Sequence, residues 1–122
     1  MSARPVEIHL HKASRVLEVA FDDGRSFRLT SEYLRVHSPS AEVAGHGPGQ
    51  EVLQVGKEDV AITGVEQVGN YAIQLEFDDG HNSGIYTWDY LYRLGAEHEQ
   101  NWNRYLKRLA EAGHRRNENR LN

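Results

Sequence analysis

The sequence predicts an α+β fold: an antiparallel sheet built from two hairpin-plus-short-helix pseudo-repeats, with a C-terminal amphipathic helix packed on it. An internal repeat indicates the two copies. Residues 17–24 (LEVAFDDG) match residues 73–80 (IQLEFDDG), and residues 30–34 match residues 87–91 after a one-residue shift. Asp-Gly between alternating apolar segments favours a hairpin turn, because glycine accepts the positive φ that such turns require.

The first copy reads as three strands followed by a helix. Apolar and polar residues alternate with the period of two that half-buried strands show. Thr30 stands at the N-cap position of the helix, and a tyrosine rather than a glutamate follows three residues later, so there is a cap but no full capping box. We expect strands at 6–11, 15–21 and 25–29 and a helix at 31–36.

The second copy repeats this order. Gly69-Asn70 supplies a hairpin turn between its first two strands, and Thr87 stands where Thr30 stands in the first copy. We expect strands at 60–68, 72–77 and 83–86 and a helix at 88–94. Tight turns join antiparallel neighbours, so the sheet should be antiparallel.

Two segments lie outside the repeat. Residues 38–56 have the composition of a loop, and a loop of this length is either a working surface or a linker. Near the C-terminus, apolar residues recur at helical spacing before the stop signal Gly113. These residues are Trp102, Tyr105, Leu106, Leu109 and Ala112. We therefore expect a single domain over residues 1–112 and a frayed tail over residues 113–122.

The composition argues against several classes of function. The 122 residues make one domain, and 14 Lys and Arg against 18 Asp and Glu give a formal net charge of −4. Without a basic surplus, we expect no binding to nucleic acid or to an anionic membrane. No apolar run reaches the roughly 20 residues of a membrane helix, and the N-terminus lacks a signal-peptide core, so we expect a cytoplasmic protein. Without cysteine, the chain forms no disulfide and no cysteine-ligated metal site.

Signatures of common enzymes are missing. The chain has no Gly-x-Ser-x-Gly, no phosphate loop ending in Gly-Lys-Ser or Gly-Lys-Thr, and no His-Glu-x-x-His. Neither His-x-Asp nor His-x-Glu occurs, which argues against the iron site of oxygenases. The Asp-Asp-Gly runs at 22–24 and 78–80 are explained by turn chemistry, because Asp caps turns with its own side chain. We therefore expect no catalytic residues and no enzyme activity.

One segment carries a resemblance to a known family. Residues 79–91 read DGHNSGIYTWDYL, and Tyr33-Leu34-Arg35 and the Phe-Asp-Asp-Gly turns precede them. These motifs resemble a family of small bacterial proteins of unknown function that are similar to the N-terminal domain of gamma-butyrobetaine hydroxylase. The resemblance is strongest over residues 5–95 and implies an α+β fold.

The resemblance also implies a metal position. In the hydroxylase, this domain carries a structural zinc held by three cysteines shortly after a Leu-Arg pair and by one histidine in a second segment. The histidine position matches His81, and the cysteine positions match Ser38, Ser40 and Val43. Hydroxyls are poor zinc ligands beside thiolates, and valine is none, so we expect this zinc site to be lost. No cofactor is therefore expected, and iron or zinc is the alternative.

Two further sets of residues are candidates for binding. A different metal site would use histidines that flank the 38–56 loop and lead the second-copy motif, namely His37, His46 and His81. A partner-binding patch would use the polar and aromatic residues after the second Asp-Gly turn, namely Ser83, Tyr86 and Trp88. The structural alternative is a hydrogen bond from His81 to the 38–49 loop, with Tyr86 and Trp88 filling the core under the helix.

These features predict a non-catalytic accessory or interaction domain. The resemblance implies a link to metal or iron–sulfur protein pathways, because the same domain is also found attached to iron–sulfur scaffold ATPases and to oxygenases. The alternative is a metal-binding protein that holds iron or zinc with its histidines. An oxygenase is least favoured, since the catalytic domain would need a further couple of hundred residues. We expect an unknown protein partner, and a monomer or a weak homodimer paired through sheet edges.

Overall fold

The computed structural model describes residues 3–45, 47 and 49–116. In chain order its elements are β1 (Pro5–His11), β2 (Val16–Phe21), β3 (Ser26–Thr30), α1 (Ser31–Val36), α2 (Ala41–Ala44), β4 (Ile62–Val68), β5 (Ala72–Phe77), β6 (Ile85–Thr87), α3 (Trp88–Ala96) and α4 (His98–Glu111). The predicted α+β fold class is confirmed. None of the described helices has the length and apolar character needed to cross a membrane.

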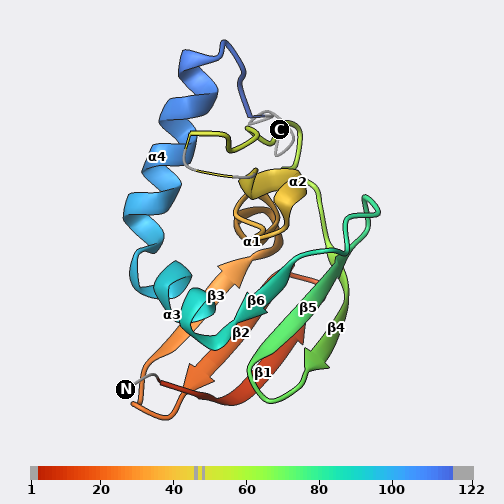
Figure 1. Cartoon of the computed structure of the whole chain (residues 1–122), viewed down its shortest axis with the longest axis vertical. Coiled ribbons are helices and arrows are strands. Elements are labelled where there is room, and N and C mark those ends of the chain that lie inside the picture. Colours follow the sequence, from red (N-terminus) through yellow and green to blue (C-terminus); the bar gives the residue numbers. More distant parts are fainter. Residues whose placement is uncertain (1–2, 46, 48, 117–122) are drawn as a thin grey trace.

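The strands form two antiparallel three-stranded sheets, one from each copy of the repeat. Their strand orders are β1-β2-β3 and β4-β5-β6. Each copy completes its own sheet before the chain enters α1 or α3, so the described strands form one sheet per copy where the sequence predicts a single sheet. Figure 1 shows the strands gathered at one end of the molecule, with α1, α2 and α4 toward the other end.

The two Phe-Asp-Asp-Gly turns have matching hydrogen bonds. Phe21 N donates to Arg25 O at 2.8 Å, and Phe77 N donates to His81 O at 3.0 Å. The glycine of each turn has a φ of 91°, in the left-handed region that glycine adopts without a Cβ clash. In each turn the side chain of the second aspartate accepts a bond from the backbone N–H two residues later. The interpretation of these aspartates as turn residues is therefore confirmed.

Several element boundaries differ from the prediction. β4 begins at residue 62 rather than 60, and β6 covers Ile85–Thr87 rather than 83–86. α3 continues to residue 96 rather than ending at 94. Its last turn packs closely on the first sheet, because a Cβ added at Gly95 would clash with the ring of Phe27.

A short helix, α2, lies inside the segment that was predicted as a loop. The Ser40 hydroxyl accepts a hydrogen bond from Glu42 N at 3.2 Å and so caps its first turn. Four residues are too few to show helical periodicity, which explains why the composition of this segment indicated only a loop.

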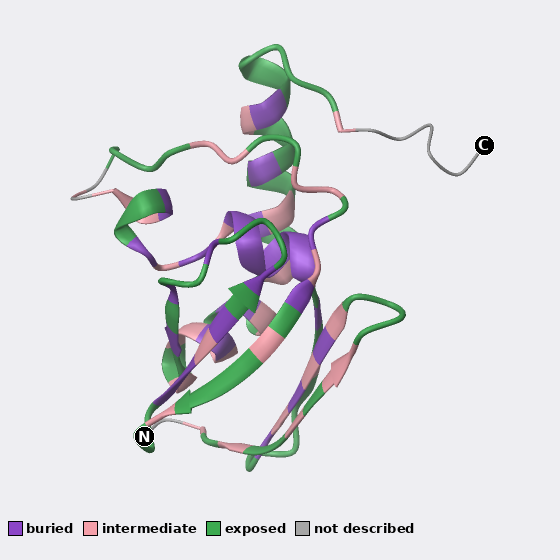
Figure 2. Cartoon of the chain, turned by 90° about the vertical axis from the view of Figure 1, so that its right-hand side faces the viewer, coloured by how far each residue is buried: buried purple, intermediate pink, exposed green. Residues whose placement is uncertain are grey.

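One hydrophobic core joins both sheets with α1 and α3. Alternate residues of the central strands β2 and β5 point into it, and α1 is buried along its whole length (Figure 2). The buried members of this core are Leu17, Val19, Phe21, Leu29, Tyr33, Leu34, Val60, Ile62, Ile73, Leu75, Phe77, Tyr86, Leu91 and Leu94. The segment between α1 and α2 directly follows the buried helix α1, which fixes where this segment begins.

The predicted C-terminal helix is present as α4, and Gly113 directly follows its C-cap residue, Ala112. His114 N donates to Leu109 O at 2.9 Å, and Gly113 N donates to Ala110 O at 3.0 Å. These two bonds and the φ of 78° at Gly113 form a Schellman motif, which confirms glycine as the stop signal. The buried side chains of Tyr105 and Leu109 pack α4 against Val36 at the end of α1.

The chain beyond α4 contacts the body of the domain through Arg116. Its Nη2 and Nε atoms donate to the two carboxylate oxygens of Glu32, at 2.6 and 2.9 Å. The guanidinium also lies 5.3 Å from the ring centre of Trp102. Arg116 belongs to the segment predicted as a frayed tail, and residues 117–122 of that segment lie outside the described residues.

Candidate functional site

A cluster of polar side chains joins the α1–α2 segment to the turn before β6. We call it the serine–histidine cluster, and its members are Ser38, Ser40, Glu42, His81 and Ser83. The first three lie between the end of α1 and the first turn of α2, and the last two follow the Asp-Gly turn after β5. The cluster thus joins the segment that follows the first copy of the repeat to the turn of the second copy.

His81 lies at the centre of this cluster. Its Nε2 is 2.8 Å from Ser38 Oγ, and its Nδ1 is 2.9 Å from Glu42 Oε1. Ser40 Oγ lies 2.7 Å from Ser83 Oγ, and Ser83 Oγ donates to Glu42 Oε1 at 3.2 Å. The hydrogen bond from His81 to the 38–49 loop, considered above as the structural alternative, is therefore present.

The electrostatics of the cluster favour a neutral imidazole. The His81 side chain is only 3% exposed, and burial lowers its pKa below the ordinary value. The charge of Arg35 lowers this pKa further, and Glu42 opposes the shift without reversing it. Nδ1–H donates a hydrogen bond to the Glu42 carboxylate, so Nε2 is unprotonated and accepts a hydrogen bond from the Ser38 hydroxyl.

The order serine, histidine, carboxylate has the connectivity of a hydrolytic triad, but Ser38 is buried and its Oγ is already engaged in hydrogen bonds. Ser38 is 2% exposed, and its Oγ also accepts the Ser40 backbone N–H at 3.2 Å. Gly84 packs so closely on the same oxygen that an added Cβ would clash with it. A nucleophile must approach the atom that it attacks. We therefore interpret the cluster as a structural link between the segment after α1 and the turn before β6.

The residues of the cluster do not fit the zinc site that the resemblance implies. Ser38 and Ser40 hold two of the three cysteine positions, and Val43, which is buried, holds the third. None of these side chains offers a thiolate, and both ring nitrogens of His81 are engaged in hydrogen bonds. Within residues 3–45, 47 and 49–116, no group of three or more His, Cys, Asp or Glu is placed to hold a metal ion.

The other predicted metal set is only partly visible. His37 Nδ1 donates to Tyr33 O at 2.9 Å, and the His37 ring centre lies 4.6 Å from that of Tyr33. His81 is engaged within the serine–histidine cluster, as described above. His46 lies outside the described residues, so metal binding by the three histidines together stays a prediction.

The three predicted partner-binding residues have different surroundings. Ser83 is exposed, and its hydroxyl is held in the serine–histidine cluster. Tyr86 is completely buried, its hydroxyl donates to Leu34 O at 2.6 Å, and burial raises its pKa. Trp88 is half-buried, and its indole Nε1 donates to Asn70 O at 2.8 Å. Tyr86 is thus a core residue, and Ser83 and Trp88 reach the surface.

Trp88 borders an open hollow of about 550 Å³. We call this region the Trp88 surface, and it is lined by Ala3, Arg4, Asn70, Tyr71, Thr87, Trp88 and Asp89. Arg4 Nη2 donates to the same Asn70 carbonyl that accepts the Trp88 indole, at 3.3 Å. Tyr71 is 52% exposed beside them. An aromatic pair and an arginine therefore stand together at the surface, two of them oriented by a shared hydrogen-bond acceptor.

Sequence reasoning missed the role of Asp79 beyond its turn. Asp79 Oδ2 lies 2.8 Å from both Arg35 Nε and Lys57 Nζ, and Oδ1 accepts His81 N at 3.1 Å. Burial by itself would raise the pKa of Asp79, but the hydrogen bonds from Lys57, His81 N and Arg35 outweigh it and hold that pKa well below its ordinary value. No spacing rule connects these side chains, because they come from three separate segments.

Comparison with known proteins places this geometry in a family. Residues 8–92 match the family model described as gamma-butyrobetaine hydroxylase-like, N-terminal. An NMR solution structure is 52% identical over 93% of this chain and 90% of its own, with a TM-score of 0.81. Another NMR solution structure is 45% identical over 94% of this chain and 86% of its own, also with a TM-score of 0.81.

A crystal structure gives a third comparison. It is of a DUF971-family protein of unknown function from Acidithiobacillus ferrooxidans ATCC 23270, 48% identical over 77% of this chain and 94% of its own, with a TM-score of 0.65. No curated protein matches the chain.

Proposed function

Because the chain belongs to the gamma-butyrobetaine hydroxylase-like N-terminal family, whose match here is to an N-terminal and not a catalytic domain, we propose that it is a non-catalytic interaction domain that binds a protein partner through the Trp88 surface. The DUF971 relative is itself a protein of unknown function, so the family leaves the role open. The proposal therefore depends on the residues of this surface.

The observation that carries the proposal is the grouping of Trp88, Tyr71 and Arg4. Tryptophan, tyrosine and arginine are the residue types most enriched at the energetic centres of protein interfaces. The Trp88 indole and the Arg4 guanidinium share the Asn70 carbonyl, and so they lose little rotamer freedom when a partner binds. Tyr71 offers a ring that is 52% exposed.

The serine–histidine cluster supports the non-catalytic part of the proposal. Its histidine is buried and bonded at both nitrogens, and the buried Oγ of Ser38 already accepts a backbone N–H. This arrangement favours a role in holding the loop in place. For the partner, we propose a protein of a metal or iron–sulfur pathway, on the strength of the family resemblance alone.

The test compares capture of partners by variants that keep the fold. The full chain, immobilised through a C-terminal tag, is used to capture proteins from a bacterial lysate, and the bound proteins are quantified by mass spectrometry. Tyr71→Ala removes an exposed ring and should abolish capture of a specific protein. Val65→Ala removes an exposed apolar side chain, 37% exposed, on β4 and is the matched control.

A partner lost from Tyr71→Ala but retained by Val65→Ala should then be purified and its Kd measured by calorimetry. We expect Tyr71→Ala to weaken that binding about thirtyfold or more, the effect of losing a hot-spot side chain worth about 2 kcal/mol. Equal capture by the wild type and both variants, with unchanged amide NMR spectra, would rule out the Trp88 surface as the binding site.

A further inference from the structure

A second hollow lies between α4, the end of α1 and the segment after α2. It encloses about 450 Å³ and shares no lining residue with the Trp88 surface. We call it the α4 pocket. Its volume falls in the range of sites that take small organic ligands. Valine side chains from separate segments form the apolar part of its wall, namely Val36, Val43 and Val52.

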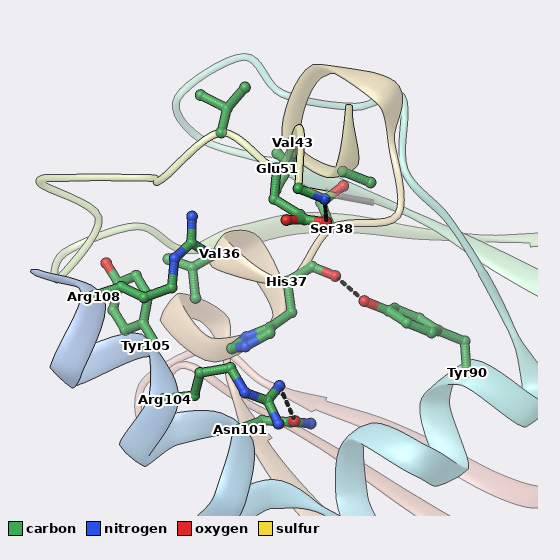
Figure 3. Close-up of a pocket in the computed structure, with 13 residues that line it drawn as sticks. Val36, His37, Ser38, Val43, Glu51, Tyr90, Asn101, Arg104, Tyr105 and Arg108 are labelled. Carbon is green, nitrogen blue, oxygen red and sulfur yellow. Dashed lines mark hydrogen bonds between the residues drawn. The ribbon is translucent and has the colours of Figure 1, made fainter. Parts of the chain in front are cut away.

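Two arginines of α4 give this pocket a positive wall. Arg104 and Arg108 are one helical turn apart and therefore lie on the same face of the helix. Figure 3 shows both side chains extending from α4 into the pocket, with the His37 ring close to Arg104. The guanidinium of Arg108 makes no hydrogen bond or ion pair with any described residue, and that of Arg104 donates to a neutral amide oxygen, Asn101 Oδ1, at 3.2 Å.

The pocket contains too little negative charge to balance these arginines. Glu51 is the one carboxylate among the described lining residues, and its Oε2 accepts the Gly49 backbone N–H at 3.2 Å. Two guanidinium charges thus face one carboxylate, in a chain whose formal net charge is −4. The local excess of positive charge therefore contrasts with the rest of the molecule.

His37 is a further nitrogen-bearing side chain that lines the pocket, beside the two arginines. Its Nδ1–H donates to Tyr33 O, and within the described residues its Nε2 has no hydrogen-bond partner. Burial lowers the pKa of His37, and the charges of Arg104, His98 and Arg108 lower it further. The hydroxyl of Tyr105 donates to Gln54 O at 2.7 Å and that of Tyr90 to His37 O at 2.5 Å, so neither competes for a ligand.

We propose that the α4 pocket binds a small organic anion whose carboxylate or phosphate group is held by Arg104 and Arg108 and whose apolar part contacts the valines. Guanidinium groups without a counter-ion bind such oxyanions through charge-assisted, often bidentate hydrogen bonds.

The test is a titration of the full chain, monitored by the NMR signals of its amide and imidazole groups. The ionic strength is kept low, because salt screens the interaction. Succinate and inorganic phosphate are added in separate titrations, which distinguishes the carboxylate from the phosphate source. We expect saturable shifts of residues lining the α4 pocket with at least one probe.

Matched variants decide whether the arginines hold the anion. Arg108→Gln should weaken binding about tenfold or more, the loss expected for charge-assisted hydrogen bonds. Lys107→Gln removes the same charge from an exposed position on the same helix and should change the Kd less than about twofold, as expected for a screened surface charge. Equal effects of the two substitutions, or no saturable shift with either probe, would overturn the proposal. Tyr71→Ala should leave anion binding intact, so this test is independent of the proposed function.

Discussion

The Tyr33 hydroxyl donates a 2.6 Å hydrogen bond to the backbone carbonyl of Leu94, and so joins α1 of the first copy to α3 of the second. A reciprocal bond of 2.5 Å runs from the Tyr90 hydroxyl to the carbonyl of His37. Tyr90 and Leu94 hold the positions in the second copy that Tyr33 and His37 hold in the first. The repeat thus extends from the sequence to the contacts between its two halves.

The hydroxyls of Tyr33 and Tyr90 should contribute more to the free energy of unfolding than the hydroxyl of an exposed tyrosine such as Tyr71. Tyr33→Phe and Tyr90→Phe each leave a half-buried or buried carbonyl without its donor, and each should lower the free energy of unfolding by about 1–3 kcal/mol. Burial raises the pKa of Tyr33 to about 12, so its proton stays available for the bond at neutral pH. Urea unfolding measures the effect. Tyr71→Phe, at a side chain 52% exposed, is the control and should change stability by less than about 0.5 kcal/mol; a similarly small change for both inner tyrosines would contradict the prediction.

The repeat could be predicted because its signals are local. Asp-Gly turns, strand alternation and threonine caps act within a few residues. The turns form as predicted, burial alternates along β2, and Thr30 and Thr87 accept hydrogen bonds from Tyr33 N and Tyr90 N. The division into two sheets was not predicted, since alternation gives each strand a buried face but not the neighbour to which it pairs. The reciprocal tyrosine bonds were missed for the same reason.

The contacts of Arg116 bear on where the folded domain ends. The Glu32 side chain is only 9% exposed, and Arg116 donates to both of its oxygens, so we propose that the domain includes residue 116 and does not end at 112. Arg116→Ala should lower the free energy of unfolding by about 1–3 kcal/mol, because a largely buried carboxylate loses charged donors. Arg115→Ala, at an exposed neighbour, is the control for charge. Equal thermal stability of the two variants would restore the frayed tail over residues 113–122 that the sequence predicts.

Stability should fall as the pH drops from about 7 toward 5. Burial lowers the pKa values of His37 and His81 in the folded chain below the value of 6.5 expected for the unfolded chain. The unfolded state therefore binds more protons in this window, so stability is fully present above pH 6.5 and is lost as the pH falls through the folded-state pKa values. The pKa of His9 is raised by Glu7 and acts in the opposite direction. Urea unfolding across this range should give a shallower loss for His81→Gln and for His37→Gln; slopes equal to that of the wild type would disprove the assignment.

The serine–histidine cluster illustrates what a family resemblance adds to periodicity. The resemblance aligns residues 38, 40 and 43 with three ligands of a zinc site and His81 with the fourth. The structure brings Ser38 and His81 within hydrogen-bond distance. Glu42 was not predicted, because it is absent from the ligand pattern and lies in a helix too short to detect from sequence. Long-range pairs of this kind have no local signal.

Restoring thiolates should restore a zinc site at the serine–histidine cluster. In the triple variant Ser38→Cys, Ser40→Cys and Val43→Cys, thiolates stand at all three positions, and His81 adds a nitrogen ligand to the sulfur ligands, which completes a tetrahedral set. The side chains at 38 and 40 already contact the 81–83 turn, so little backbone movement is needed. We expect one equivalent of zinc by elemental analysis, tetrahedral thiolate absorption bands with cobalt, and a higher Tm when zinc is present.

The control for this variant removes its fourth ligand. Adding His81→Ala should lower zinc affinity and remove most of the rise in Tm, whereas a Ser38→Cys and Ser40→Cys double variant should bind zinc more weakly than the triple variant, because it lacks one thiolate. A folded triple variant with substoichiometric zinc would show that position 43 does not reach His81. That outcome would mean that the hydrogen bonds of Ser38 and Ser40 do not mark a site whose backbone is arranged for metal.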